Sequence, residues 1–244
     1  MSVSRVLDLP GSAIQINIEG FDGKKCLISE SDVDFFQERF FNVWATIPES
    51  DRRSIETHWQ QFSPHTFRVE LQGDWWGDSR AIGSEERRQL NFRWEICGFK
   101  MDDDSLEALI AHEMAHVFQR SIGFVGKTKD ELCGTIAFPA PKFSGSPLRQ
   151  DAIIEHHADE TVLRWGYDWV KPWAFMRRFY DHTVDGFVRL KKSRKPDPSY
   201  KKAMHARLEN RYDCEVGLEA MRKHFQQLSR DARSPRPSMD EALL

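Results

Sequence analysis

The sequence has little of what marks secreted, membrane-spanning or nucleic-acid-binding proteins. It contains only four cysteines in 244 residues, at Cys26, Cys97, Cys133 and Cys214. Their scattered spacing indicates reduced thiols rather than a disulfide framework or a cysteine zinc site. No apolar run approaches the roughly 18 residues of a membrane span, and the opening MSVSRVLDLPGSAIQ lacks the pattern of a signal peptide. We therefore expect a cytoplasmic protein without a membrane partner.

An excess of charge of one sign is also missing. The chain has 35 basic and 38 acidic residues, a net charge of -3. Binding to nucleic acid through a broad positive surface depends on many phosphate contacts, so this class of function is disfavoured. The basic run at 191–195 is typical of a solvated linker and is the one feature that would favour a nucleic-acid partner. The sequence does not define the oligomeric state.

Hydrophobic periodicity separates a strand-containing first part from a helical second part. Period-two alternation predicts a hairpin over residues 13–28 and strands over 66–71 and 89–97. Helical spacing predicts helices over 31–44, 48–62, 104–121, 146–165, 173–190 and 200–228. This order of elements indicates an α+β fold. Residues 1–228 are expected to form one domain, followed by a disordered tail over 229–244.

The helix expected at 104–121 carries the residues that indicate chemistry. Asp104 is the expected N-cap, with Glu107 completing a capping box. The sequence HEMAH at 112–116 places His112 and His116 one turn apart on one helix face, where both imidazoles can reach one zinc ion. Glu113 is offset by one position and is suited to act as the general base on a metal-activated water. The alternative, two core histidines on a buried helix, is disfavoured because burying these polar groups without partners is costly.

A catalytic zinc site needs a third protein ligand and an open position. The helix expected at 146–165 contains Glu155-His156-His157-Ala158-Asp159. Glu155 and Asp159 lie four residues apart and share a face, so Glu155 can bind the metal while Asp159 accepts a hydrogen bond from a zinc-bound histidine. His156 or His157 is the alternative third ligand and would give a three-histidine site.

The two motifs together resemble the gluzincin branch of the zincin metallopeptidases, which includes thermolysin-like and minimal single-domain members. The resemblance covers residues 112–159. It implies that His112, His116 and Glu155 bind one Zn²⁺ per chain, that Glu113 is the catalytic base, and that Asp159 orients a ligand. Glu155 is favoured over the neighbouring histidines because only it has an aspartate at the family spacing.

The resemblance also implies a zincin-like architecture. An upper lobe with a mixed sheet and helices (about 1–123) and a lower, mainly helical lobe (about 124–228) would enclose an active-site cleft. The strand at 89–97 would lie beside this cleft and offer an edge to an extended peptide.

The predicted function is hydrolysis of peptide bonds in a peptide or protein substrate. Zincins also stabilise the oxyanion with a Tyr, His or Arg side chain, and Tyr167, His205 and Arg211 are candidates that their spacing does not separate. Two other classes of function stay open. One is a non-proteolytic regulatory or binding module on a zincin scaffold, and the other is a structural zinc site with His157 as a fourth protein ligand.

Overall fold

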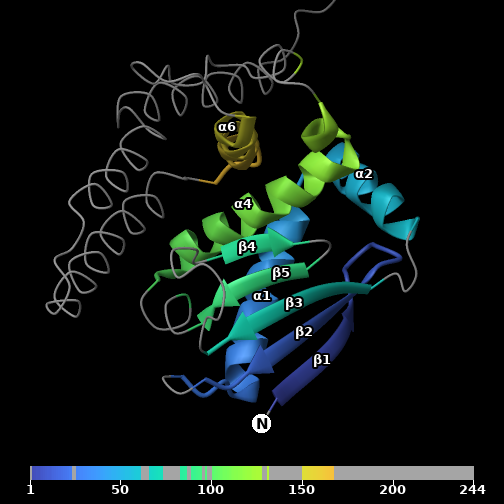
Figure 1. The fold of residues 1–244 in the computed structure, drawn as a ribbon. Helices are drawn as coiled ribbons and strands as arrows, with labels where there is room; N and C mark the ends of the chain where they lie inside the picture. The colour runs from blue at the N-terminus through green and yellow to red at the C-terminus, as the bar shows by residue number, and fades with distance from the viewer. Residues whose placement is uncertain are drawn as a thin grey trace, which may run out of the picture.

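The computed structural model describes residues 2–23, 26–61, 66–73, 83–86, 89–94, 97, 101–127, 131 and 150–167. These residues form a five-stranded sheet, four α-helices and one short 3₁₀ helix (Figure 1). The fold is therefore α+β. The helices expected at 173–190 and 200–228 and the tail at 229–244 lie outside the described residues. Within the described part, no helix is long and apolar enough to span a bilayer.

The sheet is mixed, and its two outer strands run against their neighbours. Its spatial order is β1 (Ser2–Asp8), β2 (Gln15–Phe21), β3 (Thr66–Gln72), β5 (Gln89–Arg93) and β4 (Gly83–Glu86). The three inner strands are parallel to one another, whereas β1 and β4 are antiparallel to β2 and β5.

Two expectations about the sheet are wrong. The hairpin expected at 13–28 does not form, because β2 pairs with β1 on one side and with β3 on the other. The strand expected at 89–97 ends at Arg93 and is paired on both sides, with β3 and β4. It therefore has no edge to offer to a substrate, and the outer strand on this side of the sheet is β4.

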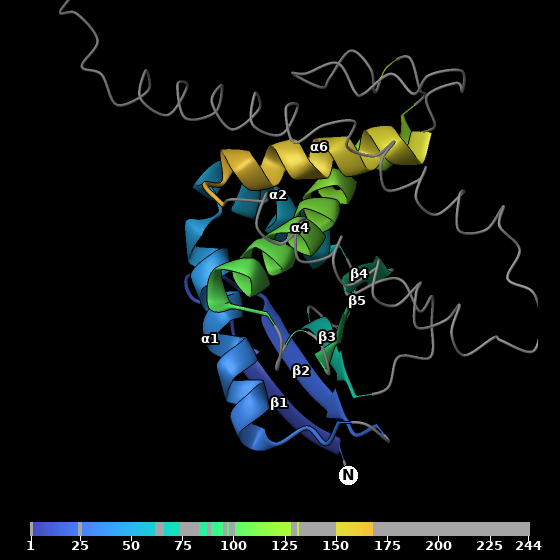
Figure 2. The same ribbon diagram turned by 90° about the vertical axis from the view of Figure 1, so that its left-hand side faces the viewer.

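Helices α1 (Glu30–Thr46) and α2 (Glu49–Gln60) agree with the helical periodicity. Helix α1 lies along one face of the sheet (Figure 2), and α2 contacts both α4 and β3. Aromatic rings make the contact. The ring of Phe36 lies 5.0 Å from that of Phe92, and the ring of Trp59 packs edge-on against Phe67 at 4.4 Å. These rings are almost fully buried, and aromatic burial of this kind dominates core energetics.

A capping box begins α1 and ties it to the end of β5. The Ser29 hydroxyl accepts from the Asp32 N–H, and the Asp32 carboxylate accepts from the Ser29 N–H at 2.8 Å. The same carboxylate accepts from the indole N–H of Trp94 at 2.9 Å. Burial acts to raise the pKa of Asp32, but these hydrogen bonds outweigh it and hold the pKa below its ordinary value of 3.8.

Helix α4 (Asp103–Ser121) lies beside the outer strand β4, and α6 (Gln150–Arg164) crosses it on the other side (Figures 1 and 2). The N-cap of α4 is Asp102, whose carboxylate accepts from the Ser105 N–H at 2.9 Å, so the expectation of Asp104 as the cap is wrong. The helix begins earlier because Asp102 has the extended backbone that an N-cap needs. Gly166, with a φ of 95°, follows α6 as expected.

The end of α6 is anchored to α2. The indole N–H of Trp165 donates to the Asp51 carboxylate at 2.9 Å, and Arg164 forms an ion pair with the same carboxylate at 2.9 Å. Asp51 and Trp165 are both buried. Helix α6 is thus held at its end by the contacts of Trp165 and Arg164 with Asp51, and along its length by α4. This packing fixes the position of α6 relative to the HEMAH segment.

Candidate metal centre

The HEMAH segment lies in the middle of α4, at the crossing with α6. His112 and Glu113 are 4% and 5% exposed, and His116 is partly exposed. The rings of His112 and His116 have centres 4.8 Å apart and are nearly perpendicular. Two imidazoles that bind one tetrahedral zinc at about 2.1 Å have ring centres about 5 Å apart. The pair therefore fits a shared metal ion.

The Nδ1 atom of His112 faces a carboxylate from α6. It lies 3.1 Å from Oδ1 of Asp159, within ion-pair distance, and both side chains are buried. A carboxylate at this nitrogen favours the imidazole form that has its proton on Nδ1 and its lone pair on Nε2. Asp159 is thus the residue that orients His112.

His116 faces an amide on its own helix. Its Nδ1 atom lies 2.9 Å from Oε1 of Gln119, one turn further along α4. The amide nitrogen of Gln119 reaches across to α6, where it donates to the backbone carbonyl of Ile154 at 2.6 Å and lies 3.0 Å from Nδ1 of His157. Gln119 is completely buried, and it connects the HEMAH segment to α6.

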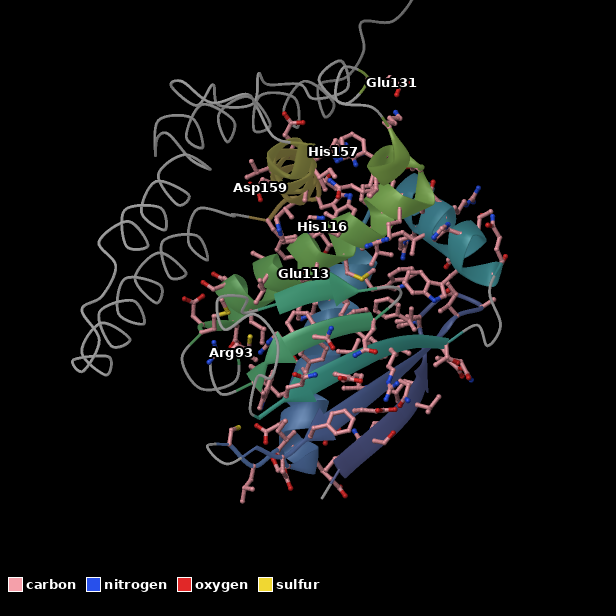
Figure 3. The ribbon with its side chains drawn as sticks, viewed as in Figure 1. Arg93, Glu113, His116, Glu131, His157 and Asp159 are labelled. Atoms are coloured by element: carbon pink, nitrogen blue, oxygen red, sulfur yellow. The ribbon has the colours of Figure 1, made fainter. Side chains whose placement is uncertain are left out.

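His157 belongs to this network and is packed on its other side by an aromatic ring. Its imidazole is stacked on Phe124, with ring centres 4.0 Å apart and planes inclined by 26°. Phe124 begins the 3₁₀ helix η1 (Phe124–Gly126), directly after Gly123, whose positive φ of 67° ends α4. Figure 3 shows His157 and Asp159 on α6, His116 below them on α4, and Glu113 on α4 nearer to β4.

Glu155 lies in α6 one turn before Asp159 and next to Ile154, whose carbonyl binds Gln119. The side chains of Glu155 and His156 lie outside the described part of the structure. Among the side chains that are described, no group of three His, Cys, Asp or Glu residues is arranged to hold a metal ion. The structure thus brings together His112, His116, His157 and Asp159, and it places only the backbone of Glu155.

Glu113 lies close to the thiol of Cys97, which follows β5 in the chain. Both the Glu113 carboxylate and the guanidinium of Arg93, at the end of β5, interact electrostatically with this thiol. Burial strongly raises the pKa of Cys97, with a smaller opposing effect of Arg93 and a further increase from Glu113. The thiol is therefore neutral at physiological pH and is not a candidate nucleophile.

Of the three candidate oxyanion-stabilising residues, Tyr167 is described. Burial raises the pKa of its hydroxyl, a hydrogen bond with Thr46 lowers it, and the charge of Glu107 raises it. The hydroxyl therefore lies near the end of α1 and the first turns of α4, on the N-terminal side of the HEMAH segment. His205 and Arg211 lie outside the described residues.

Gln119 is the residue of this site that sequence reasoning missed. A signal was present, because a polar residue three positions after a histidine lies on the same face of a helix. A glutamine among the apolar residues at the end of a buried helix needs hydrogen-bond partners. The nearest polar group along that face is His116.

Comparisons with known proteins found no match that bears on the site. No protein-family model matches the chain. Searches of curated proteins and of solved structures found no similar chain either.

Proposed function

We propose that the chain is a zinc-dependent metallopeptidase with a zincin-like fold and a gluzincin-type site. The observation that carries the proposal is the arrangement of His112 and His116. Their ring centres are 4.8 Å apart, and their Nδ1 atoms lie 3.1 and 2.9 Å from buried oxygen atoms of Asp159 and Gln119. Outer acceptors of this kind orient the histidines of metal sites and make them better ligands.

Nε2 of His112 and Nε2 of His116 are the proposed ligand atoms on α4, and Glu155 on α6 is the proposed third ligand. The position of Glu155 supports this choice. Helix α6 brings Asp159 to His112, and Glu155 precedes Asp159 by one turn on the same face. A zinc ion bound there would polarise the substrate carbonyl and activate a water for attack.

Glu113 is the proposed general base. Glu113 directly follows His112 on α4, so its side chain is offset around the helix from the two histidines. It can therefore lie beside the metal ligands without being a ligand itself. The carboxylate would take a proton from the attacking water and deliver it to the leaving amine. Because Glu113 is only 5% exposed, it is shielded from bulk water, which strengthens electrostatic effects at the reacting atoms.

The position of β4 supports a peptide as the substrate. This strand is at the edge of the sheet, antiparallel to β5, and lies beside α4 (Figure 1). An extended peptide can add to such an edge through backbone hydrogen bonds, which places its carbonyl groups along the neighbouring helix. The substrate edge is thus assigned to β4 in place of the strand at 89–97.

The test is the Glu113→Gln variant, with Glu107→Gln as its matched control on the same helix. Glu107 accepts a hydrogen bond from Asn42 on α1 and has no part in the proposed reaction. We expect Glu113→Gln to retain zinc and lose nearly all cleavage of a peptide library, while Glu107→Gln retains both. Normal turnover in Glu113→Gln would contradict the mechanism. A zinc-loaded wild type that cuts no member of the library would support a regulatory module instead.

A further inference from the structure

We infer that Gln119 is a positioning residue that determines which nitrogen of His116 presents a lone pair and excludes His157 from the set of metal ligands. The functional meaning of this inference rests on the proposed zinc site. The assignment of protons, by contrast, depends only on the hydrogen-bond network and applies to the metal-free protein.

The orientation of the Gln119 amide follows from its contact with Ile154. The backbone carbonyl of Ile154 can only accept a hydrogen bond, and one end of the amide lies 2.6 Å from it. That end is therefore the NH₂ group, because the opposite orientation would put two acceptor oxygens in contact in a buried place. It follows that the amide oxygen Oε1 is the atom that faces His116.

The amide oxygen in turn determines the form of His116. Oε1 is only an acceptor, so Nδ1 of His116, 2.9 Å away, carries the proton. The neutral ring then has its lone pair on Nε2. This is the form in which an imidazole binds a metal through Nε2, so Gln119 prepares His116 as a ligand before any metal arrives.

The same amide has the opposite effect on His157. Its nitrogen lies 3.0 Å from Nδ1 of His157 and donates to it, so the proton of the His157 ring is on Nε2. Binding a metal through Nε2 would move this proton to Nδ1, where it would face the N–H of Gln119. Stacking on Phe124 holds the ring in this orientation. His157 is therefore a structural member of the site and not its third ligand.

The amide also couples the two helices of the site. One end orients His116 on α4, and the other binds the backbone of α6 at the residue before Glu155. The distance between the α4 ligands and the proposed α6 ligand thus depends partly on this buried side chain, in addition to the packing of α6 on α4 and its anchor to α2. Removing it is expected to loosen the site as well as to release His116.

The first test is the histidine tautomers in the zinc-free full-length protein, measured by ¹⁵N NMR. We expect the Nδ1–H form for His116 and the Nε2–H form for His157. The opposite form in either ring would overturn the inference, and this result does not depend on whether the protein is a peptidase.

The second test compares two substitutions by chelator competition for zinc. Gln119→Met removes all three contacts and is expected to lower zinc affinity about 10–100-fold. Gln119→Glu retains an acceptor for His116 but loses both donors and turns an acceptor oxygen towards the Ile154 carbonyl. We expect the Nδ1–H form of His116 to be retained and the Nε2–H form of His157 to be no longer fixed. The control is Phe118→Leu, which loosens the packing of α4 on Trp165 without touching the amide.

These measurements separate a positioning role from a purely structural one. Zinc affinity in Gln119→Met equal to that of wild type, or an equal loss in Phe118→Leu, would overturn the positioning role. A wild type that binds no zinc would contradict the proposed peptidase, while the NMR result would still support or overturn the assignment of protons.

Discussion

Replacing Asp159 by asparagine tests the part of the site that depends on charge. The substitution keeps the shape of the side chain and retains an oxygen that can accept from Nδ1 of His112. It removes the negative charge that lies 3.1 Å from this nitrogen. We expect the protein to fold and its zinc affinity to fall, because a neutral acceptor makes the imidazole a poorer metal ligand than a carboxylate does.

The size of the effect can be estimated from the burial of the pair. The side chains of His112 and Asp159 are 5% and 1% exposed, so water screens their interaction little. In the zinc-bound protein a hydrogen bond from Nδ1 to the Asp159 carboxylate would contribute about 1.5–3 kcal/mol, against about 1 kcal/mol for one to a neutral acceptor. A difference of about 1–2 kcal/mol corresponds to roughly a tenfold loss of affinity or somewhat more. This lies within the range of about 10–100-fold found for outer partners of metal ligands.

The assay is chelator competition for zinc at neutral pH, with the folded state verified by circular dichroism. Asp103→Asn is the control, because Asp103 is an exposed carboxylate on the same helix whose ion pair with Arg39 is at the surface. We expect its zinc affinity to equal that of wild type. Unchanged affinity in Asp159→Asn would refute the reasoning that the carboxylate tunes His112 as a ligand.

Three further predictions concern stability. Asp51→Ala should lower the free energy of unfolding by about 1–3 kcal/mol in urea denaturation, because the buried Trp165 indole N–H loses its acceptor; an unchanged midpoint would contradict this. The pKa of Asp32 is lowered, so the stability it contributes is present at neutral pH and lost as the pH falls below 4. The stability gap between wild type and Asp32→Asn should therefore shrink from pH 7 to pH 3, and a constant gap would count against it. Gly73→Ala should destabilise the fold by about 1–3 kcal/mol, because its Cβ would meet backbone atoms at 2.3 and 2.4 Å, whereas Gly126→Ala, with nothing within 4 Å, should change the melting temperature little.

Local patterns in the sequence were sufficient for the longer elements of the described chain. Periodicity located α1, α2, β3 and α4, and the glycine after α6 marked its end. The sheet was harder to predict because its pairing is non-local. Strand β2 pairs with β3 across two intervening helices, and β4 has four residues without a hydrophobic alternation. Such pairings depend on tertiary packing, which no short window of sequence contains.

The residues of the site also divide into those that local spacing predicts and those whose contacts depend on tertiary packing. The HEMAH pattern indicated His112, Glu113 and His116 because helical spacing alone brings them together. The sequence indicated that Asp159 would orient a zinc-bound histidine, but the link to His112 in particular needed the crossing of α6 over α4. Gln119 was missed because its partners include a backbone carbonyl on another helix, and a sequence pattern does not report a carbonyl.

The measurement that tests the central claim most directly is the zinc content of the purified protein by elemental analysis, for wild type beside Glu155→Ala. A gluzincin-type site predicts about one zinc per chain in wild type and a sharp loss in the variant. Unchanged zinc in Glu155→Ala would contradict the proposed ligand set and transfer the third position to His156. Absence of zinc from wild type, even after supplementation, would contradict the metallopeptidase altogether and leave His112 and His116 as hydrogen-bonded histidines of the core.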